Sequence, residues 1–261
     1  MLEIKAKKKF GQNFLKDESV LIKIIESMPK NKNHLVEIGP GLGDLTKKLV
    51  KYKDVTAYEV DRDLFAILRT TFSKEIESKR LDLVLTDVLK VWEDGEELYN
   101  NKYDLVANLP YYIATNIILK AFDDDNCENI IVMVQKEVAD KFVASCKDKE
   151  FSSLGVMSTL LCEDREILIE VPPSSFNPPP KVDSSVIWLK KNMNTTISEE
   201  FKTFLKVVFT QPRKTLVKNL SARYEKKIVV EVLKELNIKD LARPHEVEAS
   251  LYSQIFSKLT K

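Results

Sequence analysis

The strongest constraint on the fold is a regular alternation of short apolar runs and longer amphipathic segments between about residue 17 and residue 190. The longer segments, such as 43–51, 63–78 and 115–122, carry apolar residues at helical spacing. The short runs are rich in β-branched and aromatic residues and lie at 34–38, 55–60, 81–86, 103–107 and 129–135. Strands and helices that alternate in this way are typical of a parallel sheet with helices on both faces, so we predict an α/β fold.

The pattern changes near residue 160. Apolar runs at 166–171 and 184–189 are joined by a proline-rich segment without a long helix, which predicts an antiparallel hairpin that completes the sheet. A polar linker follows at 192–197, and helical periodicity then returns at 199–209, 213–221, 226–236 and 246–258. We therefore expect a large α/β domain over residues 1–191 and a small all-helical domain over residues 192–261.

Composition excludes several classes of protein. The chain has 261 residues, 44% of them hydrophobic and 31% charged, which is typical of a folded globular protein. No apolar run approaches the length of a membrane span, and the first ten residues, MLEIKAKKKF, lack the apolar core of a secretory signal. Three widely spaced cysteines and two distant histidines suggest neither a disulfide framework nor a metal centre. We expect a cytoplasmic protein without a metal.

The net charge of +1 conceals basic ends and an acidic middle. Residues 192–261 carry 13 Lys and Arg against 8 Asp and Glu, whereas residues 1–191 have a net charge of −4. Within that acidic part, the N-terminal arm, residues 1–16, has a net charge of +4. Basic ends suit a polyanion such as nucleic acid, although an ordinary solvated surface would look the same.

The first apolar run leads into a glycine-rich turn, with residues 36–43 reading VEIGPGLG. Glycines allow a tight turn and a close approach of the backbone to a ligand. The spacing GxGxG differs from the GxGxxG of dinucleotide enzymes, and no GK[ST] of a phosphate-binding loop follows. The turn suggests a cofactor site, although a tight turn without a ligand would use the same glycines.

Two acidic residues follow the next two predicted strands. Glu59 could accept both ribose hydroxyls of a nucleoside, and Asp87 could accept an adenine amino group. Either acid alone would more simply cap a helix or lie in a solvated loop. Because the carboxyl ends of parallel strands open into one crevice, we expect both to meet Gly39 there. Without phosphate-binding chemistry, the three favour S-adenosylmethionine over NAD.

The fourth predicted strand ends in Asn108-Leu109-Pro110-Tyr111. The side-chain oxygen of Asn108 and the carbonyl of Leu109 could accept the two hydrogens of an adenine N6 amine and so direct its lone pair outward. Pro110 favours an extended Leu109, and Tyr111 offers a face for stacking the base. The sulfonium of the cofactor is a good leaving group, so this chemistry needs no metal. An ordinary β-turn would also use Asn and Pro.

Five segments occur in an order that resembles a known family: FGQNFL (10–15), EIGPG (37–41), NLPY (108–111), FNPPPKV (176–182) and QPRKTL (211–216). Together they resemble the small-subunit rRNA adenine N6,N6-dimethyltransferases, the KsgA-like enzymes, from about residue 7 to the C-terminal helices. The resemblance implies a Rossmann-like class I S-adenosylmethionine-dependent methyltransferase sheet, mostly parallel with an antiparallel last strand, and a small all-α C-terminal domain.

The resemblance also implies roles for individual residues. Around the cofactor it implies a cap formed by Asn13 and Leu15, a methionine-binding loop with Gly39 and Gly41, a ribose ligand in Glu59, adenine ligands in Asp87 and the Val88 backbone, and a further neighbour in Asn108. At the reaction centre it implies Asn108, Leu109 and Pro110, with the target adenine held between Tyr111 and Phe176, as a flipped base requires two flat faces. Phe176 would otherwise be a core residue.

The family reaction transfers four methyl groups, two to each of two adjacent adenosines near the 3′ end of small-subunit rRNA, and leaves S-adenosylhomocysteine. The family acts on an assembling small ribosomal subunit. In this chain the residues expected to contact RNA phosphates are Lys5, Lys7, Lys8, Lys9, Arg213 and Lys214. We expect a monomer.

Two segments depart from the family pattern: FSSLG at 151–155 replaces the usual Tyr-Gly-x-Leu-Ser, and Pro212 replaces a common arginine. Neither is a cofactor or amine-binding position. The nearest alternatives are a large-subunit rRNA adenine methyltransferase of the resistance type and a non-catalytic RNA-binding assembly factor on the same fold. An NAD-dependent dehydrogenase fits less well because the glycine spacing is wrong.

Overall fold

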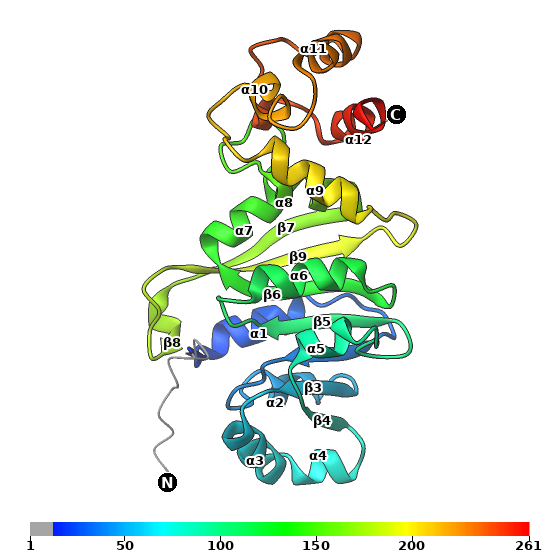
Figure 1. The fold of residues 1–261 in the computed structure, drawn as a ribbon. Helices are drawn as coiled ribbons and strands as arrows, with labels where there is room; N and C mark the ends of the chain where they lie inside the picture. The colour runs from blue at the N-terminus through cyan, green and yellow to red at the C-terminus, as the bar shows by residue number, and fades with distance from the viewer. Residues whose placement is uncertain (1–12, 261) are drawn as a thin grey trace. The chain divides into compact units, whose positions relative to one another are not determined.

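A computed structural model describes residues 13–260, which divide into two compact units (Figure 1). The first unit holds the chain up to Ala139 together with Glu166–Lys191, and the second holds Asp140–Arg165 together with the chain from Asn192 onward. The sequence placed residues 140–165 in the first domain, whereas their contacts group them with the C-terminal helices. The N-terminal lysines Lys5, Lys7, Lys8 and Lys9 lie outside the described residues.

The first unit is built on a seven-stranded sheet with the order β4-β3-β2-β5-β6-β9-β7. Neighbours from β4 to β6 pair in parallel, and β9 runs antiparallel to β6. The strand bounds are β2 His34–Ile38, β3 Val55–Glu59, β4 Leu81–Leu85, β5 Tyr103–Asn108, β6 Cys127–Gln135, β7 Cys162–Val171 and β9 Ser184–Lys191. The sheet is mostly parallel with an antiparallel strand beyond it, as the sequence predicts.

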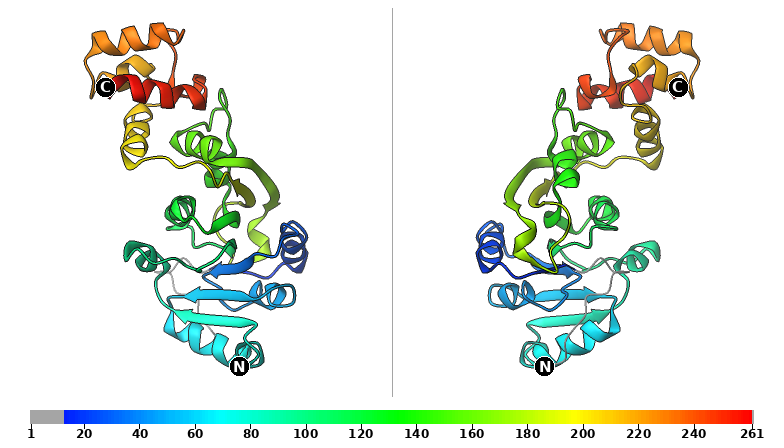
Figure 2. Two further views of the ribbon diagram at one scale, coloured as in Figure 1. Left: turned by 90° about the vertical axis from the view of Figure 1, so that its right-hand side faces the viewer. Right: turned by 90° about the vertical axis from the view of Figure 1, so that its left-hand side faces the viewer.

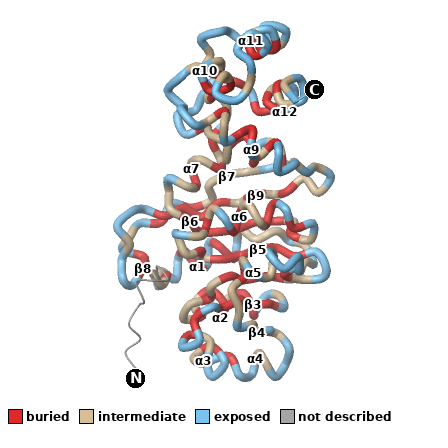
Figure 3. The backbone as a smooth tube through the Cα atoms, in the orientation of Figure 1, coloured by how far each residue is buried: buried red, intermediate tan, exposed pale blue. Residues whose placement is uncertain are grey.

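The central strands are buried on both faces because helices cover the sheet from both sides. Viewed along the sheet, α1 (Glu18–Glu26) and α2 (Thr46–Leu49) lie on one face, and α5 (Val88–Glu93) and α6 (Ala114–Asp123) lie on the other (Figure 2). Strands β3 and β5 are therefore buried even at their polar residues Thr56 and Asp104, and Figure 3 draws them buried over most of their length. In the edge strand β4 only Leu81 is buried, and the other four residues are half-buried or exposed.

Aspartates set the beginnings of three helices in this unit. Asp17 caps α1, Asp61 caps α3 (Arg62–Thr71) and Asp87 caps α5, each by accepting a hydrogen bond from a backbone N–H in the first turn. The first unit also contains α4 (Ser73–Glu77), and α7 (Lys136–Val143) begins in the first unit and continues into the second. Across residues 13–260, every helix is too short or too polar to cross a lipid bilayer.

Two predicted helices differ from the structure. The helix expected over 43–51 is confined to Thr46–Leu49, because the positive φ of Gly43 delays its start. The helix expected over 63–78 is divided into α3 and α4 at Phe72, whose φ of −108° and ψ of 26° interrupt the helical backbone.

A small second sheet joins the N-terminal segment to the proline-rich loop. Its two strands, β1 (Phe14–Leu15) and β8 (Phe176–Asn177), pair antiparallel, with Leu15 opposite Phe176. The side chain of Ser175 donates to Asp17 at 2.9 Å, and the N–H of Lys16 donates to the carbonyl of Ser175 at 2.9 Å. Two-residue strands have no periodicity of their own, so the sequence did not reveal this pairing.

The second unit contains α8 (Ser153–Leu161), α9 (Glu199–Val208), α10 (Leu216–Leu220), α11 (Lys226–Glu235) and α12 (Ala249–Leu259). Aromatic rings form much of its core. Phe204 stacks on Phe201 with ring centroids 5.9 Å apart, and both meet Phe256 of α12 at 5.4 Å. The last four of these helices agree closely in position with the periodic segments predicted from the sequence.

Gly43 provides a direct test of how tightly the glycine turn packs. Its φ is +85°, and a Cβ there would lie 2.4 Å from Cε2 of the buried Phe72. We expect G43A to lower the free energy of unfolding by about 3 kcal/mol, from overpacking and left-handed backbone strain together. G95A is the matched control, because Gly95 has a φ of +74° with nothing within 4 Å of a Cβ. It should lose only about 1 kcal/mol in the same urea titration; equal losses would contradict the packing argument.

Candidate cofactor and catalytic site

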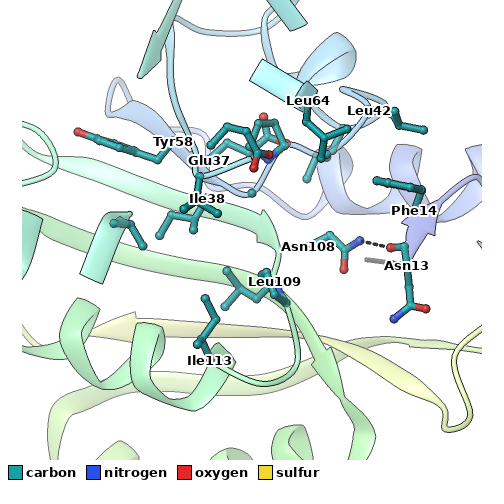
Figure 4. Close-up of a pocket in the computed structure, with 18 of the residues that line it drawn as sticks. Asn13, Phe14, Glu37, Ile38, Leu42, Tyr58, Leu64, Asn108, Leu109 and Ile113 are labelled. Carbon is teal, nitrogen blue, oxygen red and sulfur yellow. Dashed lines mark hydrogen bonds between the residues drawn. The ribbon is translucent and has the colours of Figure 1, made fainter. Parts of the chain in front are cut away.

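A pocket opens at the carboxyl ends of β2, β3, β4 and β5 (Figure 4). Its space is about 980 Å³ when the open mouth is counted. Most residues that the sequence assigned to the cofactor and the reaction line it, namely Asn13, Leu15, Gly39, Gly41, Glu59, Asp87, Val88, Asn108, Leu109, Pro110 and Tyr111. Parallel pairing brings them together, because it places the ends of these strands at one edge.

The glycine turn forms one wall of the pocket with left-handed backbone. Gly39 has a φ of +68° and packs on Pro110, whose Cδ would lie 3.6 Å from a Cβ at Gly39. Gly41 has a φ of +61°, and a Cβ there would meet the ring of Phe14 at 3.2 Å. A side chain at either position would be strained by the left-handed backbone and would press against Pro110 or Phe14 in the pocket wall.

Glu59 places a buried carboxylate beside this loop. The side chain is 4% exposed, and its Oε1 accepts a hydrogen bond from the N–H of Asp61 at 2.8 Å. Burial raises the pKa of Glu59, while hydrogen bonds from the backbone of Asp61, Gly41 and Val60 act in the opposite direction and favour the charged form. A carboxylate supported in this way can accept further hydroxyl hydrogens from a ligand.

Glu37 is a second buried acid in the pocket, and the sequence did not assign it a role. It lies in β2, is 1% exposed, and accepts a hydrogen bond at 2.7 Å from the hydroxyl of Thr46. Burial raises its pKa to about 8, opposed by the Thr46 hydrogen bond and assisted by the charge of Glu59. An acid within an otherwise apolar strand, next to the glycine turn, was the signal that would have identified it.

Asp87 has two roles at the end of β4. One carboxylate oxygen accepts from the N–H of Leu89 at 3.1 Å and so caps α5. The half-buried side chain also lines the pocket, as does Val88, whose N–H lies in the first turn of α5, where a helix provides no internal acceptor. The helix-capping interpretation and the ligand interpretation of Asp87 are therefore compatible.

The carboxamide of Asn108 is held by the N-terminal segment. Its Nδ2 donates to the backbone carbonyl of Asn13 at 3.3 Å, and Figure 4 shows the two residues facing one another at the pocket. This contact directs the amide nitrogen toward Asn13 and leaves Oδ1 as the acceptor. Across residues 13–260, the structure provides no second hydrogen-bond partner for this side chain.

The residues after Asn108 are anchored without using the carbonyl of Leu109. The N–H of Leu109 donates to the carbonyl of Met133 at 3.1 Å, and the carbonyl of Pro110 accepts from the N–H of Ile113 at 3.1 Å. The hydroxyl of Tyr111 lies 2.6 Å from that of Ser184. The backbone of the loop is therefore fixed, while two oxygens, Asn108 Oδ1 and the Leu109 carbonyl, accept no hydrogen bond from the described residues.

The N-terminal segment covers the glycine turn. Phe14 packs on Gly41, and Lys16 forms an ion pair of 2.6 Å with Asp44, which also lines the pocket. Phe14, Asp44 and the largely exposed Tyr112 belong to the pocket lining but were not assigned from the sequence. Phe14 belongs to the family segment FGQNFL (10–15), so the resemblance pointed to this segment. It assigned roles to Asn13 and Leu15 but none to the ring of Phe14.

Among the described residues, three predicted site residues do not line this pocket. Phe176 is 5% exposed and belongs to the hydrophobic core with Leu15 and Val186. A core position was the alternative that the sequence analysis left open for this residue. Arg213 and Lys214 are exposed residues of the second unit, just before α10. A stacking role for Phe176 and phosphate contacts for the two cations remain predictions.

Comparisons with known proteins agree with the geometry. The sequence profile of the family described as ribosomal RNA adenine dimethylase matches residues 3–261. The protein named ribosomal RNA small subunit methyltransferase A in Aliarcobacter butzleri is 59% identical over 99% of this chain and 98% of its own length. Its namesake in Sulfurimonas denitrificans is 53% identical over 98% and 94%. The crystal structure of a dimethyladenosine transferase from Plasmodium falciparum superposes with a TM-score of 0.78 at 25% identity, covering 93% of this chain and 95% of its own.

Glu37 makes the stability of the protein depend on pH. Its pKa of about 8 in the folded state lies above the ordinary value of 4.5, so the folded protein retains a proton that the unfolded chain has released. The free energy of unfolding should therefore fall as the pH rises from about 5 to 8, by up to about 1.4 kcal/mol per pH unit. E37Q should remove this decline, measured by urea unfolding at several pH values. E77Q, at an exposed glutamate of α4, controls for the loss of one charge; a decline that persists in E37Q would contradict the assignment.

Proposed function

The chain belongs to the ribosomal RNA adenine dimethylase family, and from the geometry of its pocket we propose how its residues carry out the methyl transfer. It is an S-adenosylmethionine-dependent methyltransferase that dimethylates adenine in small-subunit rRNA. The observation that supports our mechanism most strongly is the hydrogen bond from Asn108 to Asn13, since it directs the Asn108 oxygen toward the substrate.

The residues of the pocket fit S-adenosylmethionine. Gly39 and Gly41 form a left-handed turn that lines the pocket and lets the backbone approach a ligand closely, and the buried Glu59 carboxylate retains capacity to accept hydroxyl hydrogens. Asp87 and the backbone of Val88 would hold the adenine, while Asn13 and Leu15 would cover the methionine end. When bound, the cofactor supplies an electrophilic methyl group on a sulfonium leaving group.

Catalysis by the chain itself then consists of orienting a weak nucleophile. The N6 amine of adenine is a poor nucleophile because its lone pair is delocalised into the ring. Asn108 Oδ1 and the Leu109 carbonyl each accept one amine hydrogen, which favours a pyramidal nitrogen whose lone pair faces the cofactor. Tyr111 offers its ring for stacking the base, so the contribution of the protein is positioning and preorganised electrostatics.

The position of the target adenosines, the number of methyl groups that each receives and the residues that contact the RNA are proposed from the family resemblance. We propose that two adjacent adenosines near the 3′ end of the rRNA each receive two methyl groups within an assembling small subunit, in the cytoplasm. Phe176 would complete the stack on the target base, and Arg213, Lys214 and the N-terminal lysines would contact phosphates. The enzyme would act as a monomer.

A large-subunit target is not favoured, because both curated relatives carry small-subunit names. Mass spectrometry of rRNA from cells with and without this gene product tests the assignment. We expect the dimethyladenosines of the small subunit to disappear while those of the large subunit stay unchanged. Loss of methylation only from the large subunit would overturn it.

Asn108→Ala should lower kcat about 100- to 1,000-fold, because removal of one preorganised polar group at a reaction centre has effects of this size. Binding to the small subunit should change little. The measurement is transfer of labelled methyl groups to unmethylated subunits, with subunit binding followed by sedimentation. Asn101→Ala, at an exposed loop residue, is the control. Wild-type turnover in N108A would refute the role of the amide.

Glu59→Gln should mainly weaken the cofactor. A hydrogen bond to a charged acceptor contributes about 1.5–3 kcal/mol, so the Kd for S-adenosylhomocysteine should rise about 10- to 100-fold in calorimetry. E93Q changes an exposed glutamate at the end of α5 and should bind as the wild type does. An unchanged Kd in E59Q would show that the carboxylate does not contact the nucleoside.

A further inference from the structure

The hydroxyl group of Tyr111 has a role that base stacking does not explain. A phenylalanine ring would stack on an adenine as well as a tyrosine ring. In this structure the hydroxyl lies 2.6 Å from the side-chain oxygen of Ser184, a good distance for a hydrogen bond between two hydroxyls. Burial raises the pKa of Tyr111, so its hydroxyl is protonated at neutral pH and takes part in that bond as a neutral group.

Ser184 is a rigid partner for this hydroxyl. It is the first residue of β9, is fully buried, and lies opposite Gln135 of β6. The antiparallel pairing of β6 and β9 fixes its backbone over seven residue pairs. The loop that bears Tyr111 is held separately, by the N–H of Leu109 on the carbonyl of Met133 in the same strand β6. The Tyr111 ring is therefore attached to the sheet at its backbone and at its hydroxyl end.

We propose that Ser184 is a positioning residue for methyl transfer, holding the Tyr111 ring at the angle that presents its face to the target adenine. The proposal rests on the stacking role assigned to Tyr111 above. Ser184 does not line the pocket, so it acts through Tyr111 and touches neither substrate nor cofactor.

The hydrogen bond between the hydroxyls of Tyr111 and Ser184, here called the tether, should affect transfer of the second methyl group more than transfer of the first. The unmethylated amine has two hydrogens, and Asn108 and Leu109 accept one each. After the methyl group has moved from the sulfonium to the nitrogen and the nitrogen has released one proton to solvent, only one hydrogen remains, so one of these two hydrogen bonds is lost. The stacking face of Tyr111 then provides a larger share of the orientation of the base, and a ring that can rotate would slow the second transfer most.

The neighbouring residue provides a matched control. Successive side chains in a strand point to opposite faces, so Ser185 points away from Ser184. Ser185 is equally buried, and its hydroxyl has no hydrogen-bond partner within the described residues. S184A and S185A thus each remove one buried hydroxyl from β9, but only S184A removes the tether.

The experiment compares wild type, S184A, Y111F, the double variant and S185A on unmethylated small subunits, with mono- and dimethyladenosine separated by mass spectrometry. We expect S184A and Y111F each to slow the second transfer about 3- to 10-fold, as the loss of one hydrogen bond predicts, and to accumulate monomethyladenosine. The double variant should be no slower than either single variant. The Kd for S-adenosylhomocysteine should be unchanged in all of them, and S185A should match the wild type.

Three results would overturn the inference: a wild-type product ratio in S184A, additive effects of S184A and Y111F, or the same defect in S185A. Y111F removes the same hydrogen bond by deleting the hydroxyl of Tyr111, which is less buried than Ser184. The proposal therefore stays testable if S184A folds poorly. Failure of the wild type itself to methylate small subunits would instead overturn the proposed function.

Discussion

Parallel pairing of β4, β3, β2 and β5 is the constraint on which the site depends. Because these strands run in the same direction, the residues after each of them emerge at one edge of the sheet. Gly39, Glu59, Asp87 and Asn108 are far apart in the sequence and meet only for that reason. The buried strands keep this edge rigid, which is what a mechanism based on orientation requires.

Several residues at this edge have a structural and a chemical role at the same time. Asp87 caps a helix and faces the pocket, and Gly41 accommodates Phe14 while its N–H supports the Glu59 carboxylate. Gly43, by contrast, is required by the ring of Phe72 and does not line the pocket. The three glycines of the turn therefore have different physical reasons to be glycine, although they look equivalent in the sequence.

The strands and most site residues could be predicted because their signals are local. The apolar residues 105–107 followed by Asn-Leu-Pro-Tyr identify both the strand β5 and its end. Features that arise from contacts distant in the sequence could not be predicted in this way. The pairing of Leu15 with Phe176, the grouping of residues 140–165 with the C-terminal helices, and the tether between Tyr111 and Ser184 all depend on the completed fold. Glu37 was missed because an acid in a buried strand contradicts the usual pattern.

The contact between Asn108 and the carbonyl of Asn13 explains why an amide, and not an acid, stands at the end of β5. An aspartate would offer oxygens to the substrate amine equally well. It would, however, turn one of them toward the lone pairs of the Asn13 carbonyl, and electrostatic repulsion would push the N-terminal segment off the glycine turn. In the proposed mechanism, the asymmetry of the carboxamide, a donor on one side and an acceptor on the other, would let a single side chain hold the N-terminal segment at the pocket and bind the nucleobase.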